Sequence, residues 1–332
     1  MKTSFITGIS GQDGSYLAEF LLERDYRVHG LIRRASTGPA LANLQAIKND
    51  ITLHEGDLSD ADFVSRTLDD LGPSVEVYNL GAQSFVPLSW EAPSYTLGVN
   101  TFGFLNVLEA CRRLNDEYPK MPVRVYQAST SEMYGNHRGL LDENAPMIPR
   151  SPYGVAKLAS HRLARVYRES YGMFIACGVL FNHESPRRGE MFVTRKITKA
   201  VAQIAKGTQK SLMLGNIQSK RDWGFAGDYV RAMWLMLQQD KPDDFVIGTG
   251  APYSVEDFVV FSFEAANELL DRELDWTKYT KHDDKFDRPA DIEHLCADSR
   301  KAEEVLGWKP MVDCKALAHM MVKADLTAEG LL

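Results

Sequence analysis

The chain has 332 residues, of which 44% are hydrophobic and 25% are charged. These proportions are those of an ordinary globular protein of about two domains, and they exclude the disordered, collagen-like and coiled-coil classes. Lys and Arg number 38 against 45 Asp and Glu, a net charge of −7 that disfavours a general nucleic-acid binder.

The N-terminal region predicts no targeting segment. Its first residues are too polar for a secretory signal, and no stretch of the chain approaches the ~18 apolar residues of a membrane span. The four cysteines, Cys111, Cys177, Cys296 and Cys314, are widely spaced and fit neither a zinc cage nor a disulfide framework. We therefore expect a cytoplasmic protein with reduced thiols and no metal.

Strand patterns and helical patterns alternate through the first half of the chain. The apolar runs that predict strands are residues 4–7, 26–32, 51–53, 75–80, 123–126 and 174–180. Between them, residues 16–22 and 101–114 show the spacing of amphipathic helices. Such alternation predicts an α/β fold, with a doubly wound parallel sheet that binds ligands at the carboxyl ends of its strands.

The alternation weakens after residue 180, where we expect a smaller lobe that closes over the sheet. A polar stretch at 182–189 precedes a helical pattern at 193–206. Ser254 and Asp257 predict the capped start of a helix that runs to Leu270. The charged stretch 271–291 is interpreted as an irregular, partly exposed connection.

A glycine-rich turn stands between the first predicted strand and the first predicted helix. Gly8, Gly11 and Gly14 have the GxxGxxG spacing of short-chain dehydrogenases, and Gln12 and Asp13 lie between them. Glycines let the backbone approach a pyrophosphate, whose charge is favoured at a helix N-terminus. The alternative is a plain glycine-rich turn, but the order of strand, turn and helix favours a dinucleotide site.

Two arginines follow the second predicted strand. Arg33 and Arg34 stand there, with Ser36 close behind and no acidic residue beside them. An acid at this place is typical of NAD sites, whereas an arginine suits the 2′-phosphate of NADP. The residues therefore favour NADP, and the alternative is a basic pair that is solvated or lies at a subunit interface. The turns at 56–58 and 80–84 would then line the adenine and nicotinamide sides.

A tyrosine and a lysine open a helix beyond the fifth predicted strand. Tyr153 and Lys157 are four residues apart, so they share one helical face. A cation beside a tyrosine favours the phenolate, which is otherwise a poor base at neutral pH. Thr130 is placed to bond the substrate hydroxyl that Tyr153 deprotonates. Alone, this spacing could be a surface tyrosine over a lysine, but after such a glycine turn it indicates an oxidoreductase-type site.

Glu132 adds a carboxylate that simple oxidation or epimerisation does not need. It follows Thr130 by two residues, so it could take a proton next to a new carbonyl and return it to a leaving hydroxyl. The alternative is a glutamate that caps the neighbouring turn.

Basic residues recur near polar turns in the second half. The basic residues are His183, Arg187 and Arg188, which follow Asn182, and then Lys196, Arg221 and Arg288. In an acidic protein this set favours a diphosphate ligand, which the planar fork of arginine suits. Each of them could equally be an ordinary surface cation. For His183, a backbone-bonded structural role and a cofactor contact are both open.

Several of these stretches together resemble the GDP-mannose 4,6-dehydratase family of the extended short-chain dehydrogenase/reductase superfamily. The resemblance runs over nearly the whole chain. Its most specific pieces are GQDGSYLAE at 11–19, QASTSEMYG at 127–135, PRSPYGVAKL at 149–158, FNHESPRRG at 181–189 and KRDWGFAGDYV at 220–230.

The resemblance implies a modified Rossmann domain at 1–180, to which later segments return, and a GDP-sugar domain mainly at 181–332. It also implies tightly held NADP and homodimers or homotetramers. The catalytic positions it implies are Thr130, Glu132, Tyr153 and Lys157. The implied cofactor contacts are Gly8, Gly11, Gln12, Asp13, Arg33, Arg34, Ser36, Asp57, Leu58, Leu80, Ala82, Ser84, Tyr95, Tyr153, Lys157, His183 and Arg188. The implied substrate contacts are Ser84, Ser131, Asn182, Lys196, Arg221 and Arg288.

The activity implied is dehydration of GDP-mannose to GDP-4-keto-6-deoxy-mannose. Carbon 4 is oxidised by NADP⁺, water is eliminated across carbons 5 and 6, and the hydride returns to carbon 6. One rival is a nucleotide-sugar 4-epimerase or 4-ketosugar reductase, which would have no use for Glu132. Another is a catalytically silent NADP-binding regulatory protein.

The sequence departs from the family pattern in two places. Asp287 and Asp291 flank Arg288 where the family carries an aromatic residue and a glutamate, which leaves the exact sugar open. Ala35 replaces the first of two serines after Arg34, which bears on cofactor grip or assembly.

Overall fold

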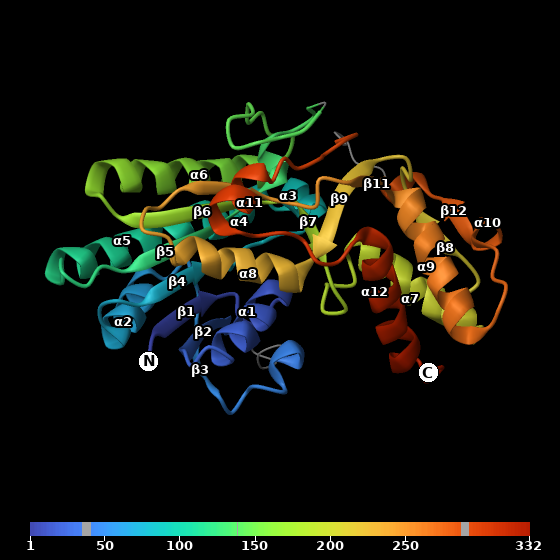
Figure 1. The fold of residues 1–332 in the computed structure, drawn as a ribbon, viewed down its shortest axis with the longest axis horizontal. Coiled ribbons are helices and arrows are strands. Elements are labelled where there is room, and N and C mark those ends of the chain that lie inside the picture. The colour runs from blue at the N-terminus through green and yellow to red at the C-terminus, as the bar shows by residue number, and fades with distance from the viewer. Residues whose placement is uncertain (35–40, 138, 287–291) are drawn as a thin grey trace.

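A parallel sheet dominates the computed structural model, which describes residues 1–34, 41–137, 139–286 and 292–332 (Figure 1). The order across it is β10-β6-β5-β4-β1-β2-β3. Its strands are β1 (Thr3–Thr7), β2 (Arg27–Arg33), β3 (Ile51–Gly56), β4 (Glu76–Asn79), β5 (Arg124–Thr130), β6 (Phe174–Leu180) and β10 (Asp244–Ile247). The chain runs outward from β1 on one side and from β4 on the other, which opens a crevice at the carboxyl ends of these strands.

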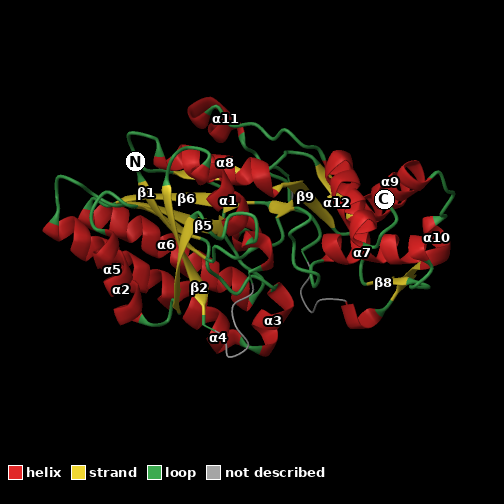
Figure 2. Ribbon diagram, turned by 90° about the horizontal axis from the view of Figure 1, so that it is seen from below, coloured by secondary structure: helices red, strands yellow, loops and turns green. Residues whose placement is uncertain are grey.

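Helices cover both faces of this sheet (Figure 2). One face carries α1 (Gln12–Leu22), α8 (Ala226–Leu237) and α11 (Arg300–Leu306), and the other carries α2 (Ala61–Leu71), α5 (Gly103–Glu117) and α6 (Pro152–Tyr171). The short helices α3 (Val86–Glu91) and α4 (Pro93–Leu97) and a π-helical turn (Gly98–Phe102) lead into α5. The doubly wound α/β fold expected from the sequence is confirmed, and each of the six apolar runs forms a strand of the sheet.

A second lobe lies beyond the carboxyl ends of the strands (Figure 1). Its helices α7 (Val193–Lys206), α9 (Val255–Leu270) and α12 (Cys314–Ala328) pack around an apolar core that includes Trp223 and Phe258. The predicted cap of α9 is present, because the Ser254 hydroxyl accepts from the Asp257 amide and the Asp257 carboxylate accepts from the Ser254 amide. The small sheets of this lobe are β11 (Pro252–Ser254), β9 (Lys220–Phe225) and β7 (Asn182–Glu184), and β12 (Thr280–His282) with β8 (Leu212–Leu214).

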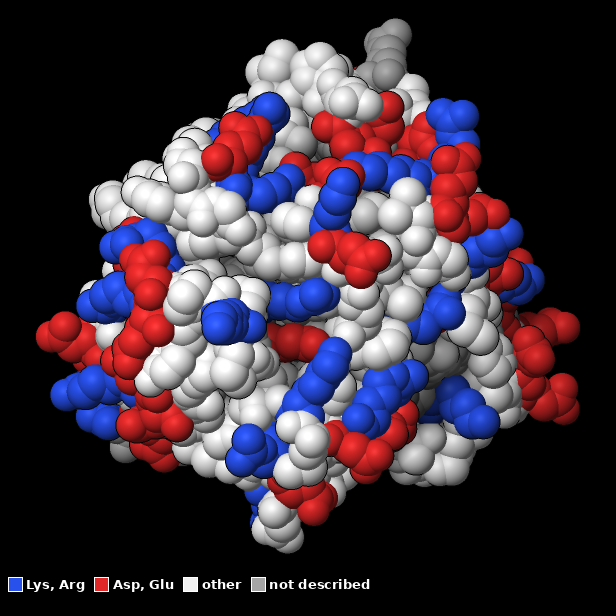
Figure 3. All heavy atoms as spheres, turned by 60° about the vertical axis from the view of Figure 1, so that its left-hand side comes forward, with Lys and Arg blue, Asp and Glu red and all other residues white. Residues whose placement is uncertain are grey.

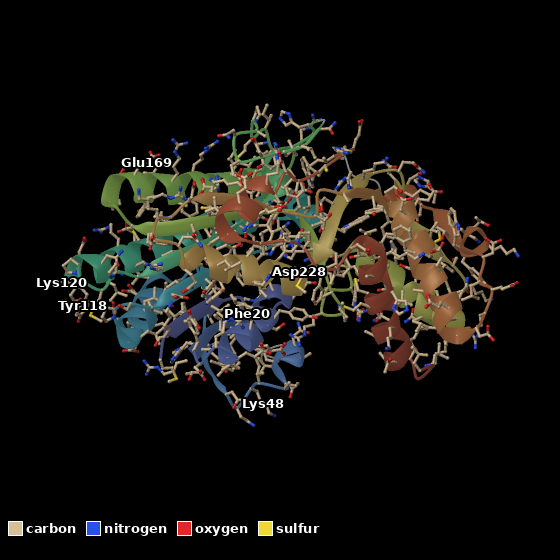
Figure 4. The ribbon with its side chains drawn as sticks, in the orientation of Figure 1. Phe20, Lys48, Tyr118, Lys120, Glu169 and Asp228 are labelled. Atoms are coloured by element: carbon tan, nitrogen blue, oxygen red, sulfur yellow. The ribbon has the colours of Figure 1, made fainter. Side chains whose placement is uncertain are left out.

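Segments from the second half of the chain return to the large sheet. β10 pairs with β6 at its edge, and α8 packs against α1 on one face. Asp228, at the start of α8, accepts hydrogen bonds from the amides of Met311 and Val312 just before α12 (Figure 4). The polypeptide therefore crosses between the two lobes more than once.

Two expectations about the second half need correction. The stretch from 271 to 286 is not an irregular connection, because it contains α10 (Trp276–Tyr279), β12 and a 3₁₀ turn (Asp284–Phe286). Hydrogen bonding of β12 to β8 outweighs the charged composition there. Residues 287–291 lie outside the described residues. Within the polar stretch 182–189, Asn182–Glu184 forms β7, which the sequence pattern did not reveal.

The surface carries charges of both signs. On the face shown in Figure 3, Lys and Arg side chains are interspersed with Asp and Glu. Some of them form helix-spaced ion pairs, such as Arg112 of α5 with Glu109 and Asp116. Exposed pairs of this kind contribute little to stability. None of the described helices is both long and apolar enough to cross a membrane.

Candidate active site

A large cleft lies at the carboxyl ends of the sheet strands, between the sheet and the second lobe. Its volume is about 1390 Å³, and both lobes line it. Nearly all of the residues predicted for the site face this cleft. They are Gly8, Gly11, Gln12, Asp13, Arg33, Asp57, Leu58, Leu80, Ala82, Ser84, Tyr95, Thr130, Ser131, Glu132, Tyr153, Lys157, Asn182, His183, Arg188, Lys196 and Arg221.

Three predicted residues stand apart from this set. Arg34 does not line the cleft, and its guanidinium donates to the Glu55 carbonyl at 3.3 Å on the outer edge of the sheet. Ser36 and Arg288 lie outside the described residues. Their roles stay predictions from the sequence.

The glycine-rich turn is packed so tightly that larger residues do not fit. Gly8 has a φ of +72°, and a Cβ there would lie 2.9 Å from the Gly81 Cα in the turn after β4. A Cβ on Gly14 would lie 2.4 Å from the Gly8 carbonyl oxygen. The turn thus brings the start of α1 against β1 and leaves its backbone open to the cleft.

Asp13 and His183 join the glycine-rich turn to β7. The Asp13 carboxylate lies 2.8 Å from His183 Nε2, and His183 Nδ1 lies 2.8 Å from the Phe181 carbonyl oxygen. The His183 ring also stacks on Tyr229, with 4.5 Å between ring centroids. Both ring nitrogens therefore bond to the protein, and the cofactor contact of His183 stays a prediction from the sequence.

This ion pair shifts the pKa values of both partners. Burial alone would raise the pKa of Asp13, but the charge and hydrogen bond of His183 outweigh it and lower that pKa to about 2. Burial alone would lower the pKa of His183, but Asp13 raises it overall. A carboxyl with a lowered pKa stabilises the fold above its unfolded value near 4, and a histidine with a raised pKa stabilises it below its unfolded value near 6.5.

Replacing Asp13 by Asn is therefore expected to lower the free energy of unfolding by about 2 kcal/mol between about pH 4 and 6.5. The difference from the parent protein should shrink as the pH falls toward 2 or rises through the folded pKa of His183. Urea unfolding of the ligand-free protein across this pH range measures it. Asp62→Asn, in the first turn of α2, is the matched control. Parallel pH profiles for the parent and Asp13→Asn would show that the pair carries no such stabilisation.

At the end of β2, Arg33 lies beside Tyr95 of α4. Its guanidinium donates to the Tyr95 hydroxyl at 2.8 Å, and both side chains are exposed where they line the cleft. The guanidinium retains further donors, because it has five N–H groups. The pair lies near the end of the cleft that is formed by the turns after β2 and β3.

The start of α6 presents Tyr153 and Lys157 to the cleft. The Ser151 hydroxyl caps the helix by accepting from the Gly154 amide at 3.0 Å. Tyr153 is 8% exposed and Lys157 is 5% exposed. Burial raises the pKa of Tyr153 to about 12, the neighbouring Thr130 hydroxyl opposes this rise, and the Glu132 charge adds to it. Burial also lowers the pKa of Lys157 to about 8.

Lys157 has no hydrogen-bond or ion-pair partner among the described residues. A buried amine without a partner is costly, so this position is built for a ligand rather than for stability. Burial holds Tyr153 in its neutral form, and the aid of Lys157 to the phenolate stays a prediction from the sequence.

The end of β5 supplies Thr130, Ser131 and Glu132. Thr130 and Ser131 are buried, and the Thr130 hydroxyl accepts from the Glu132 amide at 3.3 Å, so Thr130 caps the turn that follows. The Glu132 side chain instead lines the cleft, close enough to Tyr153 for its charge to raise the tyrosine pKa. A carboxylate, a phenol and a hydroxyl thus converge beside Lys157.

The second lobe closes the far side of the cleft with cations and aromatic rings. Lys196 of α7 lies 3.2 Å from the Phe286 ring centroid, and Arg188 lies 3.6 Å from that of Phe192. Arg221 of β9 is 8% exposed. The sequence reasoning missed both aromatic residues. Phe286 stands two residues before Arg288, so a search for an aromatic residue close to that arginine would have found it.

Comparisons with known proteins agree along the whole chain. A family model described as GDP-mannose 4,6 dehydratase matches residues 5–321. GDP-mannose 4,6 dehydratase 1 of Arabidopsis thaliana is 48% identical over 98% of this chain and 90% of its own length. The GDP-mannose 4,6-dehydratase of Vibrio cholerae is 45% identical over 98% of this chain and 94% of its own length.

Solved structures with the same fold include enzymes of different reactions. A dTDP-glucose 4,6-dehydratase of Streptomyces venezuelae, with NAD and TYD bound, has a TM-score of 0.84, 23% identity and coverage of 99% of this chain and 98% of that one. A Thermus thermophilus UDP-glucose 4-epimerase in complex with NAD has a TM-score of 0.82, 27% identity and coverage of 97% and 98%. RMD from Pseudomonas aeruginosa, complexed with NADPH, has a TM-score of 0.79, 21% identity and coverage of 98% and 100%.

Proposed function

Because the chain belongs to the GDP-mannose 4,6-dehydratase family, we propose that it is a hydro-lyase that converts GDP-mannose to GDP-4-keto-6-deoxy-mannose. The observation that carries this proposal is the convergence of Glu132 and Tyr153 in one cleft. A 4-epimerase or 4-ketosugar reductase would use the tyrosine and the lysine, but its reaction has no step that requires the Glu132 carboxylate.

The cleft fits a nicotinamide dinucleotide on two counts. The glycine-rich turn leaves no room for a Cβ at Gly14, and it exposes a backbone that a pyrophosphate can approach. Lys157 offers a buried amine with no partner among the described residues, suited to the hydroxyls of a ribose. When bound in its oxidised form, the nicotinamide supplies an electron-pair acceptor and a positive charge.

Three residues of the catalytic set, Thr130, Glu132 and Tyr153, act on the sugar itself in this reaction. Tyr153, once ionised, takes the proton of the hydroxyl on carbon 4 while that carbon is oxidised, and Thr130 holds the hydroxyl. The new 4-ketone acidifies the hydrogen on carbon 5, which Glu132 removes. Glu132 gives this proton to the hydroxyl on carbon 6, which leaves as water. Once carbon 6 has been reduced, Tyr153 returns its proton to carbon 5.

The rest of the cleft holds the substrate in this account. Asn182, Lys196 and Arg221, with Arg288 from the sequence pattern, bind the GDP-sugar, and Ser84 and Ser131 face the hexose. Arginine and lysine offer charge-assisted hydrogen bonds to a diphosphate. The Rossmann-type part of the chain, proposed as 1–180 with later segments, holds the cofactor, and 181–332 mainly holds the substrate. By the same family likeness, the assembly is a homodimer or homotetramer.

We assign NADP rather than NAD to the cofactor site, on the strength of Arg33. Its guanidinium is exposed at the end of β2 and donates one hydrogen bond to Tyr95. The other N–H groups of the guanidinium can bind a 2′-phosphate. Arg33→Ala is expected to weaken NADP binding about 30-fold, or by about 2 kcal/mol, because a charge-assisted hydrogen bond is lost. NAD binding should change little.

Calorimetric titration of the two cofactors measures this difference. Arg27→Ala removes an arginine from the other end of β2, where its guanidinium donates to Thr3, and serves as the control. Equal losses of NADP and NAD affinity in Arg33→Ala would contradict the assignment.

The substrate assignment is tested by the products of a panel of nucleotide sugars. Incubation with GDP-mannose should give a product that has lost one water, with no net consumption of NADP. UDP-glucose and dTDP-glucose should be turned over far more slowly. An epimerised product of unchanged mass would favour the 4-epimerase, and no turnover of any GDP- or dTDP-hexose would favour a silent NADP-binding protein.

A further inference from the structure

Behind the catalytic residues, a buried polar cluster connects the cleft with the edge of the sheet at β10. His161 of α6 lies one helical turn beyond Lys157, on the same face as Tyr153. Its Nδ1 is 3.0 Å from the Ser129 hydroxyl of β5, and its Nε2 is 3.7 Å from the Asp244 carboxylate of β10. Ser129 and His161 are each 3% exposed, whereas the Asp244 side chain is 21% exposed.

One end of this cluster opens on the cleft, because Ser129 lines it together with Lys157. The other end is anchored at the edge of the sheet. There Arg168 donates to the Asp244 carboxylate at 2.5 Å and to the Cys177 sulfur at 3.8 Å. A guanidinium at this distance disfavours a metal ion between His161, Cys177 and Asp244, although their ligand atoms lie within 4.8 Å of one another.

The groups around His161 fix its protonation. Burial and the cationic side chains of Arg162, Arg165 and Arg168 lower its pKa, and Asp244 acts against them. Cys177 is uncharged, because burial raises the pKa of its thiol. His161 is therefore neutral at rest, with its Nε2–H toward Asp244 and its Nδ1 accepting from the Ser129 hydroxyl.

We propose that Ser129, His161 and Asp244 form a proton-transfer line between the catalytic Tyr153–Lys157 pair and solvent. Lys157 and Ser129 line the same cleft without a direct hydrogen bond, so in this route a cleft water bridges them. A proton that leaves Tyr153 passes by way of Lys157 and this water to the Ser129 oxygen, while the Ser129 proton moves to His161 Nδ1. The imidazolium so formed releases its Nε2 proton to Asp244, which exchanges it with water. No bond other than O–H and N–H is made or broken.

The first ionisation of Tyr153 needs such a route, because each later turnover returns the tyrosine to its ionised form. Tyr153 is protonated at neutral pH, because burial raises its pKa to about 12, so it must lose a proton before it can act as a base. A bound dinucleotide would cover the cleft side of Tyr153 and Lys157. The cluster leads out instead at the edge strand β10. Because its endpoint is Tyr153, this inference rests on the proposed function of that residue.

The test follows the ionisation of Tyr153 in the protein with bound NADP⁺ after a rapid jump in pH. Tyrosinate absorbance is recorded by stopped flow, and the signal of Tyr153→Phe is subtracted to isolate Tyr153. His161→Asn keeps a polar atom near the position of Nδ1 to bond Ser129 but removes the link to Asp244. We expect it to slow the relaxation about tenfold or more at unchanged final amplitude, as for removal of a proton-transfer group.

Three further variants sharpen the result. His319→Asn, which alters a histidine of α12 outside the cleft, should relax like the parent. His161→Ala should be slow and should regain speed with added imidazole. Ser129→Ala should be slow as well, and it serves if His161→Asn unfolds in urea too readily to assay.

An unchanged relaxation rate in folded His161→Asn would overturn the proposal. A change in final amplitude alone would overturn it too, since it would show that His161 sets only the ionisation equilibrium of Tyr153. The experiment contains no sugar nucleotide. A failure of the protein to dehydrate GDP-mannose is therefore separate from a failure of the proton line.

Discussion

Tyr153→Phe is expected to lower kcat with GDP-mannose about 10²–10⁴-fold, because it removes only the oxygen that exchanges a proton with the substrate. The ring stays in place, buried at the start of α6 beside Thr130, so the fold and the affinity for NADP should be nearly unchanged. Steady-state kinetics and cofactor titration measure both quantities. The loss should appear in kcat rather than KM, because the proton is transferred only during the chemical steps.

Tyr134→Phe is the matched control for this substitution. Tyr134 is also buried, and its hydroxyl donates to the Asp142 carbonyl outside the cleft. Its removal should cost about 1 kcal/mol of stability and leave kcat near the parent value. If Tyr153→Phe retained parental kcat, the phenol could not be the base of the reaction.

Glu132→Gln is expected to separate the two halves of the reaction. The amide cannot accept the proton from carbon 5, so formation of the dehydrated product should fall about 10²–10⁴-fold. Oxidation at carbon 4 needs only Tyr153, Lys157 and Thr130 and should persist. The variant should therefore accumulate reduced cofactor and a 4-keto sugar that has kept its water.

Near-ultraviolet absorbance of the reduced nicotinamide and the mass of the quenched sugar nucleotide report these two species. Glu169→Gln, at the far end of α6, removes a carboxylate away from the cleft and should behave like the parent (Figure 4). If Glu132→Gln dehydrated GDP-mannose at the parental rate, the Glu132 carboxylate could not be the base that removes the proton from carbon 5.

The parts of this protein that follow local rules were predictable from the sequence. The glycine-rich turn and the Tyr153–Lys157 pair depend on spacing within one turn or one helix, so Gly8 and Lys157 were found without a structure. The capped start of α9 followed from Ser254 and Asp257 for the same reason. Five of the six apolar runs could be read as strands because helices bury them on both faces of the sheet, which favours continuous apolar sequence. The run at 51–53 forms the edge strand β3, which is only partly buried.

Contacts between distant segments were not predictable from these patterns. Asp13 and His183 are 170 residues apart, and no local sequence pattern predicts the ion pair that joins them. The strand β10 was not predicted, because it comprises only Asp244–Ile247. Four residues are too few to show a clear strand pattern of hydrophobicity. His161 stands at helical spacing from Lys157, but its bonds to Ser129 and Asp244 arise only where α6 crosses β5 and β10.

Deuterium labelling gives the most direct test of the central claim that one carboxylate and one phenol carry out an internal oxidation, elimination and reduction. GDP-mannose is incubated with the protein and NADP⁺ in deuterated water, and the product is examined by mass spectrometry and NMR. The account predicts loss of one water, a single solvent deuterium on carbon 5, and retention on carbon 6 of the hydrogen that began on carbon 4. A product that keeps its oxygen on carbon 6, or that carries solvent deuterium on carbon 6, would contradict it.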